Sequence, residues 1–195
     1  MLKEYFKKKS KLSIVIDVAI GIMLLLLLIP GTRKDMAALI LRPTIYIHQP
    51  KVKANKVKLK ENTYNWKLQN ADGIVFTLHD FKDKVVFINL WATHCPPCIA
   101  EMPDLQKLYN DYGSKVEFLF VSNEEAEKVN RFMTKKKLSL PTYKPLSQYP
   151  NDFETSSIPT TYVINKDGEI VIHKVGLAKW NSQRIRKVLD ALINK

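Results

Sequence analysis

The two cysteines of the chain, Cys95 and Cys98, lie between a β-type segment and a helical segment. The segment Lys84–Trp91 is a nearly continuous apolar run, as expected of a strand that is buried on both faces. Residues 96–112 repeat apolar side chains at helical spacing. A buried strand that leads through a cysteine turn into a helix predicts an α/β arrangement.

The other globular elements follow from local patterns. Residues 66–81 predict two short strands around an Asp-Gly turn, and residues 115–122 predict a second buried strand. Residues 123–137 predict a helix that is capped by its first residue and ends in lysines. A second hairpin over 160–176 and a closing amphipathic helix over 181–195 complete the order. We therefore expect a mixed central sheet flanked by helices.

The N-terminal segment has the pattern of a membrane anchor. Residues 1–11 are basic, and the 19 residues from 12 to 30 carry a single charge, Asp17. That length can span a bilayer core as a helix. The run exceeds an ordinary signal-peptide core and no A-x-A site follows it, so we expect one retained transmembrane signal anchor rather than a cleaved signal or a buried helix. Five lysines precede the run, which favours a cytoplasmic N-terminus and a catalytic domain on the extracytoplasmic (periplasmic) side of the cell membrane.

A basic juxtamembrane linker is expected over residues 31–65. Its apolar part, residues 36–47, is too short to span a bilayer and contains Pro43, so it should lie at the membrane surface or pack on the domain. Residues 51–62 alternate lysine with apolar residues, and we expect a solvated tether in preference to an edge strand. The globular domain then covers residues 66–195.

The net charge of +12 does not indicate a nucleic-acid-binding domain. Residues 1–65 contain 13 Lys/Arg and 4 Asp/Glu, whereas residues 66–195 contain 18 and 15. Most of the basicity belongs to the N-terminal segments, which a membrane-facing tail explains better than a phosphate-binding surface. We expect no nucleic-acid partner.

The spacing of Cys95 and Cys98 at the start of a helix suits a disulfide. The helix N-terminus favours a thiolate on Cys95, which can attack a foreign disulfide before Cys98 resolves the mixed disulfide. Pro96 and Pro97 have no N–H group, so the Cys95 thiolate is less stabilised and the couple is more reducing. A protonated His94 would act in the opposite direction. We therefore expect the pair to donate electrons.

Two other uses of the cysteine pair compete with this interpretation. A zinc site needs two further ligands, and the four histidines of the chain form no paired H-x₃₋₅-H. We expect no metal site. A purely structural disulfide would stabilise the fold little, because it closes so small a loop.

The stretch VVFINLWATHCPPCIAEMP, followed later by SIPTTYVINKDGEIV, resembles the thioredoxin superfamily. More narrowly, it resembles the TlpA/ResA type of membrane-anchored thiol–disulfide oxidoreductase. The resemblance covers about residues 66–195 and implies a thioredoxin-like fold with an extra N-terminal β-hairpin. It implies that Cys95 is the nucleophile and Cys98 the resolving thiol. It also implies that Pro159 is a cis-proline opposite the pair, and that the backbone of Ile158 binds a substrate segment.

Further site residues follow from the same resemblance. Glu101 matches an acid of this subgroup that tunes the thiols and assists proton transfer, and Asn89 stands where typical thioredoxins carry a buried Asp. The alternative for Glu101 is an exposed acid in the first turn of the helix. Trp91 would belong to the wall of the substrate site and to the core. His94 replaces the usual aromatic residue, so it could tune Cys95, change partner choice, or be a tolerated surface substitution.

These observations predict an enzyme, a membrane-tethered protein-disulfide reductase that needs no bound cofactor. Its substrate could be apocytochrome c before haem attachment, as in some relatives, and a membrane thiol-transfer protein would supply the electrons. The alternatives are a copper-handling chaperone, a disulfide-forming oxidase and a binding module with incidental thiols. Copper-delivering relatives usually carry C-x-x-x-C with a distant His. A thiol peroxidase is disfavoured, because Ala92 stands where its motif requires Thr.

Overall fold

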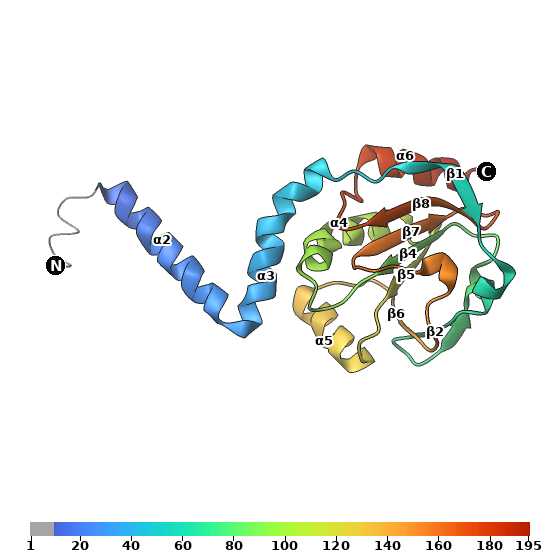
Figure 1. The fold of residues 1–195 in the computed structure, drawn as a ribbon, viewed down its shortest axis with the longest axis horizontal. Helices are drawn as coiled ribbons and strands as arrows, with labels where there is room; N and C mark the ends of the chain where they lie inside the picture. The colour runs from blue at the N-terminus through green and yellow to red at the C-terminus, as the bar shows by residue number, and fades with distance from the viewer. Residues whose placement is uncertain (1–9) are drawn as a thin grey trace.

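An eight-stranded mixed sheet forms the centre of the fold (Figure 1). The computed structural model describes residues 10–195, apart from the side chains of residues 27, 30, 31 and 53–56. The strands are β1 (Val52–Lys58), β2 (Lys67–Asn70), β3 (Val75–Thr77), β4 (Val86–Leu90), β5 (Glu117–Val121), β6 (Thr142–Pro145), β7 (Thr160–Ile164) and β8 (Glu169–Val175). They lie in the order β1-β8-β7-β4-β5-β6-β2-β3. The central strand β4 runs parallel to β5 and antiparallel to β7.

Helices cover one face of the sheet and short 3-10 turns cover the other. Within residues 10–195 the α-helices are α2 (Lys11–Leu28), α3 (Pro30–Leu41), α4 (Pro96–Tyr112), α5 (Ala126–Lys136) and α6 (Gln183–Ile193). Apolar residues of α4, α5 and α6 join one hydrophobic cluster with Phe87 of β4. Ile88, the next residue along β4, belongs to the second cluster on the opposite face. The expectation that this strand is buried on both faces is confirmed.

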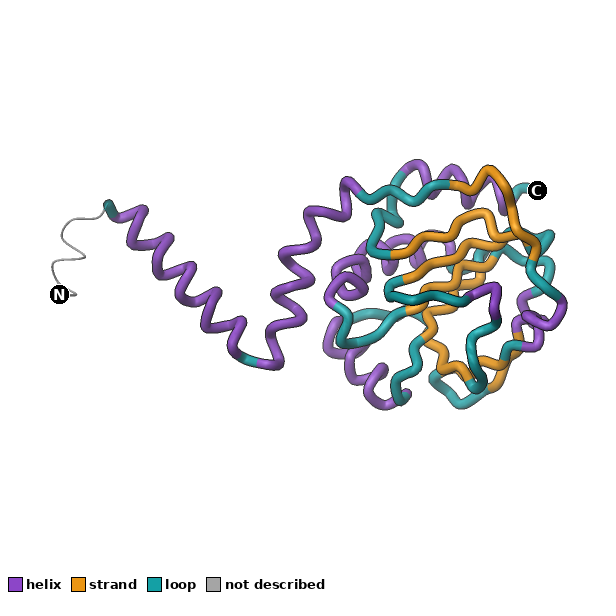
Figure 2. The backbone as a smooth tube through the Cα atoms, in the orientation of Figure 1, coloured by secondary structure: helices purple, strands orange, loops and turns teal. Residues whose placement is uncertain are grey.

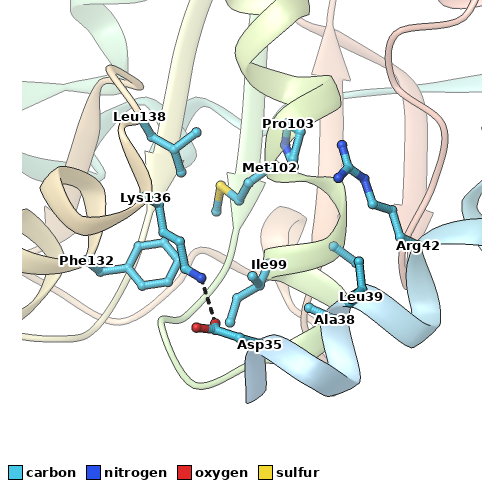
Figure 3. A pocket seen from close by; sticks show the side chains of 11 residues that line it. Asp35, Ala38, Leu39, Arg42, Ile99, Met102, Pro103, Phe132, Lys136 and Leu138 are labelled. Atoms are coloured by element: carbon cyan, nitrogen blue, oxygen red, sulfur yellow. Dashed lines mark ion pairs between the residues drawn. The ribbon is translucent and has the colours of Figure 1, made fainter. Parts of the chain in front are cut away.

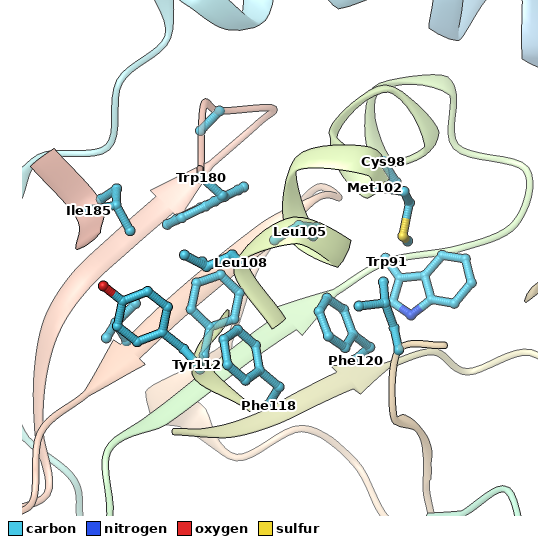
Figure 4. Packing of buried hydrophobic residues seen from close by; sticks show 14 of the residues in the cluster. Trp91, Cys98, Met102, Leu105, Leu108, Tyr112, Phe118, Phe120, Trp180 and Ile185 are labelled. Carbon is cyan, nitrogen blue, oxygen red and sulfur yellow. The ribbon is translucent and has the colours of Figure 1, made fainter. Parts of the chain in front are cut away.

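The larger cluster fixes α4, and with it the cysteine turn, against the sheet. Figure 4 shows Leu105 and Leu108 of α4 above the aromatic rings of Phe118 and Phe120, with Trp180 and Trp91 on opposite sides of the cluster. Both leucines are fully buried. Truncating either to alanine is expected to cost about 2–5 kcal/mol of the free energy of unfolding, since little of the cavity could collapse. The packing of α4 therefore holds the cysteine turn, where this helix begins, in a fixed position on the sheet.

Most of the expected elements are present with small shifts of their ends. The hairpin over 66–81 appears as β2 and β3, the helix over 96–112 as α4, and the hairpin over 160–176 as β7 and β8. The predicted cap of α5 is wrong. The helix begins at Ala126 after Glu125, so Asn123 lies outside it.

The expectation of a solvated tether over residues 51–62 is wrong, because β1 in this segment pairs with β8. Val52 lies opposite Ile172 and Lys58 opposite Glu169, so this segment is an edge strand. An alternation of lysine with apolar residues fits an edge strand, because lysine can remain in water and discourage pairing with another chain. The sheet therefore begins at Val52, before the expected domain boundary at residue 66.

The apolar segment 36–47 packs on the domain, which was one of its two expected positions. Ala38 and Ile45 are buried in the larger cluster. This packing places α3 beside α4. Figure 2 shows α3 at the edge of the domain that faces the N-terminus.

Residues Lys11–Leu28 are helical, and Ser10 caps them by accepting a hydrogen bond from the amide of Ser13 at 3.2 Å. Many large apolar side chains of α2 are exposed, including Leu12 and Leu25. Among residues 10–195, no helix meets the length and apolarity that a membrane crossing requires. A basic tail was expected over residues 1–11, and residues 1–9 of it lie outside the described residues.

Candidate active site: a disulfide at the start of α4

Cys95 and Cys98 form a disulfide in the turn between β4 and α4, with their Cα atoms 5.3 Å apart. Cys95 is the N-cap residue of α4, and its Sγ accepts a hydrogen bond from the amide of Cys98 at 3.2 Å. The amide of Ile99 instead donates to the backbone carbonyl of Cys95 at 3.1 Å. With prolines at 96 and 97, the first turn of α4 thus directs one backbone amide to this sulfur. Cys98 has no exposed surface, whereas Cys95 keeps 7%.

The peptide bond between Ile158 and Pro159 is cis, as the family resemblance implied. β7 follows directly and pairs antiparallel with β4, which brings the loop before β7 to the end of β4 where the cysteines lie. The carbonyl oxygen of Ile158 lies 3.7 Å from Sγ of Cys95. Cys95, Ile158 and Pro159, which were all predicted site residues, therefore lie together.

A groove of roughly 300 Å³ lies beside the disulfide. Trp91, His94, Tyr149 and Ile158 are among its lining residues. Trp91 is 2% exposed, so it serves the core and the groove wall together. His94 and Ile158 are exposed at the rim.

Glu101 is fully buried one turn after Cys98, so the alternative of an exposed first-turn acid is wrong. Its Oε1 accepts a hydrogen bond from the side-chain amide of Asn89 at 3.0 Å. Its Oε2 accepts from the backbone amide of Ala178 at 3.2 Å and from the indole nitrogen of Trp180 at 3.1 Å. Burial raises the pKa of Glu101 to about 8, although these three donors act in the opposite direction. The carboxyl is therefore largely protonated at pH 7.

Glu124 organises the loop on the other side of the cysteines. Its carboxylate accepts hydrogen bonds from the amide of Thr93 at 2.5 Å and from the Thr93 hydroxyl at 2.9 Å. Nδ1 of His94 lies 3.2 Å from the same carboxylate, and Nζ of Lys128 lies 2.5 Å away. Burial would raise the pKa of Glu124, but the hydrogen bonds from Lys128, Thr93 and His94 outweigh it and lower that pKa to about 2. His94 is therefore a neighbour of a fixed negative charge.

Three residues at this site were not found from the sequence. Trp180 reaches Glu101 from 79 positions away, and Lys34 reaches the Thr93 carbonyl from 59 positions away. No local pattern could have predicted either contact. Glu124 had a usable signal, because it follows β5, the parallel neighbour of the strand that leads to the cysteines. Polar residues just after the carboxyl ends of parallel strands commonly form sites.

Comparison with known proteins agrees with this geometry. The Redoxin family profile matches residues 50–192, so the chain belongs to that family. A relative, the thiol-disulfide oxidoreductase ResA of Halalkalibacterium halodurans, is 37% identical over 123 residues, covering 61% of this chain and 70% of the relative. The thioredoxin-like protein YneN of Bacillus subtilis is 32% identical over 130 residues, covering 65% and 75%. The chain is thus an oxidoreductase of the ResA/TlpA-like type within the thioredoxin superfamily.

Solved structures agree on the fold. A putative thiol-disulfide oxidoreductase from Bacteroides vulgatus superposes with a TM-score of 0.55 at 31% identity, covering 65% of this chain and 90% of that one. A putative thiol:disulfide interchange protein DsbE from Chlorobium tepidum gives 0.56 at 19% identity, covering 75% and 99%. The expected thioredoxin-like α/β fold with a mixed sheet is confirmed.

Proposed function

We propose that the chain is a membrane-tethered protein-disulfide reductase whose domain faces the extracytoplasmic side. The observation that carries the proposal is the Cys95–Cys98 disulfide at the start of α4, next to the Ile158 carbonyl and an open groove. Such a pair needs one sulfur that a partner can reach and one that is reserved for the internal step. The complete burial of Cys98 supports Cys95 as the nucleophile and Cys98 as the resolving thiol.

The reaction consists of two exchange steps. The Cys95 thiolate attacks one sulfur of the substrate disulfide, an intermolecular S–S bond forms, and one substrate thiolate leaves. Cys98 loses its proton and attacks Sγ of Cys95, which forms the internal disulfide and releases the second substrate thiolate. The substrate gains two electrons and two protons, and the cysteine pair is oxidised. A dithiol on a membrane thiol-transfer protein then returns the two electrons.

The ionised fraction of Glu101 is the proposed acceptor of the proton that Cys98 loses. Glu101 is three residues further along α4, so the two Cβ atoms should be about 5–6 Å apart. The pKa of Glu101, raised to about 8, is close to that of a free thiol, about 8.5, and proton transfer between the two groups is then nearly balanced. An acid with an ordinary pKa would be a poor acceptor for this proton.

The groove beside the disulfide is the proposed substrate site. An extended substrate segment would run past the backbone of Ile158 and Pro159, where the Ile158 carbonyl already faces the Cys95 sulfur at 3.7 Å. Trp91 would support the wall, and His94 would contact the substrate at the rim.

The reducing direction is supported by the shortage of amide donors at Cys95. Only the amide of Cys98 among the first-turn amides of α4 points to its sulfur, since residues 96 and 97 are prolines and the Ile99 amide is used elsewhere. A thiolate with few donors is less stable, and a less stable reduced form is a stronger reductant.

The tether is proposed on the sequence pattern, and the partners on the family resemblance of the cysteine motif. The exposed apolar side chains of α2, which the domain does not cover, support attachment to a membrane through residues 12–30. Apocytochrome c before haem attachment is the first substrate to test. Protease digestion of intact and permeabilised cells tests the orientation, because an extracytoplasmic domain is digested without permeabilisation of the inner membrane.

The deciding experiment is the reduction potential of the Cys95–Cys98 pair in the full-length protein, equilibrated with defined thiol buffers in detergent. A value at or below about −230 mV supports a reductase, and a value near −120 mV would make the protein a disulfide-forming oxidant. Cys98→Ser should then trap substrates as mixed disulfides on Cys95. The matched variant Cys95→Ser should trap none, and equal trapping by both variants would contradict the assigned roles.

A further inference from the structure

The juxtamembrane helix α3 reaches the loop that carries the active-site cysteines. Nζ of Lys34 donates a hydrogen bond to the backbone carbonyl of Thr93 at 3.1 Å. Thr93 is 1% exposed and stands two residues before Cys95. A residue from the segment next to the proposed anchor thus contacts the backbone of the redox turn.

The position of α3 is supported by packing and charge. Ala38 is buried against the domain, and Asp35 pairs with Lys136 of α5 at 2.7 Å, with each side chain at most 30% exposed. Figure 3 shows Asp35 and Ala38 of α3 facing Ile99 at the start of α4 and the side chains of α5, around a cavity of about 190 Å³. The Lys34 ammonium also lies 5.7 Å from the centre of the Phe132 ring. These contacts fix the helix from two sides.

Thr93 is held at each of its polar groups. Its amide and hydroxyl donate to Glu124, and its carbonyl accepts from Lys34. The first pair of contacts comes from the segment after β5, and the last comes from α3. The backbone that leads into Cys95 therefore has little freedom while both sides remain docked.

We propose that Lys34 is a positioning residue that sets the reactivity of Cys95 through Thr93, so that the docking of α3 couples the membrane-proximal segment to the thiol chemistry. This inference rests on the proposed function and adds to it a way of tuning the same site. The ammonium group of Lys34 favours a thiolate nearby, because opposite charges attract. The helix also orients the carbonyl of Thr93, so that the turn presents the sulfur in one geometry.

Two of the acids near the turn, Glu124 and Asp35, are already paired. Glu124 is paired with Lys128 and contacts His94, and the charge of Asp35 is offset by Lys136. Glu101 lies on the buried side of α4 and is largely neutral at pH 7 because its pKa is raised to about 8. Removal of the Lys34 charge is therefore expected to change the field at Cys95.

The test is the pH dependence of alkylation of Cys95 by iodoacetamide in the full-length protein in detergent, with Cys98→Ala as the common background. In Lys34→Met, the apparent pKa of Cys95 should rise by about half a unit, which corresponds to ~3-fold slower alkylation at pH 6. Lys34→Arg keeps the charge and a donor, so it should restore the parent profile. Lys115→Gln changes an exposed lysine in the turn after α4, so it is the matched control and should have no effect.

An unchanged profile in Lys34→Met would overturn the proposal, and so would an equal shift in Lys34→Arg. A second pair of variants covers the case in which Lys34→Met does not fold. Asp35→Lys and Lys136→Asp should each loosen α3 and slow the alkylation, and the double exchange should restore it. Loss of stability without any shift of the alkylation profile would reduce the contact to a structural role.

The readout also separates this proposal from the proposed function. Alkylation reports the Cys95 thiol whatever the direction of electron flow. Trapping by Cys98→Ser reports the exchange with substrates whatever the role of Lys34. Each can therefore fail without the other.

Discussion

The side-chain amide nitrogen of Asn89 lies 3.0 Å from Oε1 of Glu101, and neither side chain has any exposed surface. Asparagine cannot take a proton, so Glu101 is the titratable member of this buried pair. The Asn89 oxygen is buried and has no hydrogen-bond partner among the described residues. Rotation of the amide by half a turn would let that oxygen accept the proton of a neutral Glu101. The pair can thus accommodate both states of the carboxyl, as a proton carrier must.

Glu101→Gln should slow the internal exchange step. Glutamine has the shape of the protonated acid but cannot accept the Cys98 proton. We expect release of 2-nitro-5-thiobenzoate from its mixed disulfide with Cys95 to be at least ~10-fold slower at pH 7. The rates should converge above about pH 9, where a thiol of ordinary pKa ionises unaided. Asp104→Asn, on the same helix, should match the parent, and an unchanged rate in Glu101→Gln would remove the acid from the mechanism.

Stability should fall with rising pH because of the same carboxyl. The pKa of Glu101 is raised in the folded state from 4.5 to about 8, so between these values the folded protein binds more protons than the unfolded chain. Its contribution is fully present below pH 4.5 and is lost as the pH rises toward 8, at a limiting slope of about 1.4 kcal/mol per pH unit. Urea denaturation from pH 5 to pH 8 should show this slope in the parent and lose it in Glu101→Gln. Parallel curves for the two proteins would contradict the raised pKa.

Asn89→Asp should be tolerated in acid and harmful in base. The change restores the buried acid of typical thioredoxins, but here it places a second carboxyl about 3 Å from Glu101. Two adjacent buried carboxyls cannot both ionise without a large penalty, which we expect to reach about 3 kcal/mol at pH 8 and to vanish near pH 5. The exposed Asn130→Asp is the matched control. A destabilisation that does not depend on pH would point to altered packing instead.

The sequence was sufficient for the elements with strong local patterns. The two buried strands and α4 were predictable because their apolar residues recur with a strand or helix pattern. β6 was not predicted as a strand, because Thr142–Pro145 lacks a clean alternation of apolar residues. For β1 an edge strand was weighed, but a solvated tether was preferred because the segment is rich in lysine. Their pairing depends on partners elsewhere in the sheet, β2 and β5 in the case of β6, and β8 in the case of β1.

The same division applies to the site. The cysteines, Glu101 and Pro159 were found because their spacing is a family pattern. The burial of Glu101 was left open, because an acid in the first turn of a helix is equally compatible with exposure. Its environment is set by Asn89, 12 residues before it, and by Trp180, 79 residues after it, and only the fold brings these side chains to Glu101.

His94→Ala should change thiol reactivity in acid more than in base. The His94 side chain is 71% exposed, so its loss should alter the free energy of unfolding by no more than about 0.5 kcal/mol. An imidazolium favours a nearby thiolate, whereas neutral imidazole does not. Alkylation of Cys95 should therefore slow at pH 5 and remain unchanged at pH 8. His79→Ala serves as the control, and equal rates at pH 5 would make His94 a tolerated surface substitution.

Glu124→Gln should destabilise the protein at neutral pH and lose this effect in acid. The pKa of Glu124 is lowered from 4.5 to about 2 by its hydrogen bonds, so its stabilising charge is present above pH 4.5 and is lost as the pH falls toward 2. We expect Glu124→Gln to cost about 2 kcal/mol at pH 7, which urea denaturation can measure, and the difference between the two proteins to shrink as the pH falls from 4.5 toward 2. The exposed Glu127→Gln should cost no more than about 0.5 kcal/mol. If the full difference persisted at pH 2, the hydrogen-bond geometry rather than the charge of Glu124 would hold Thr93 and the cysteine turn in place.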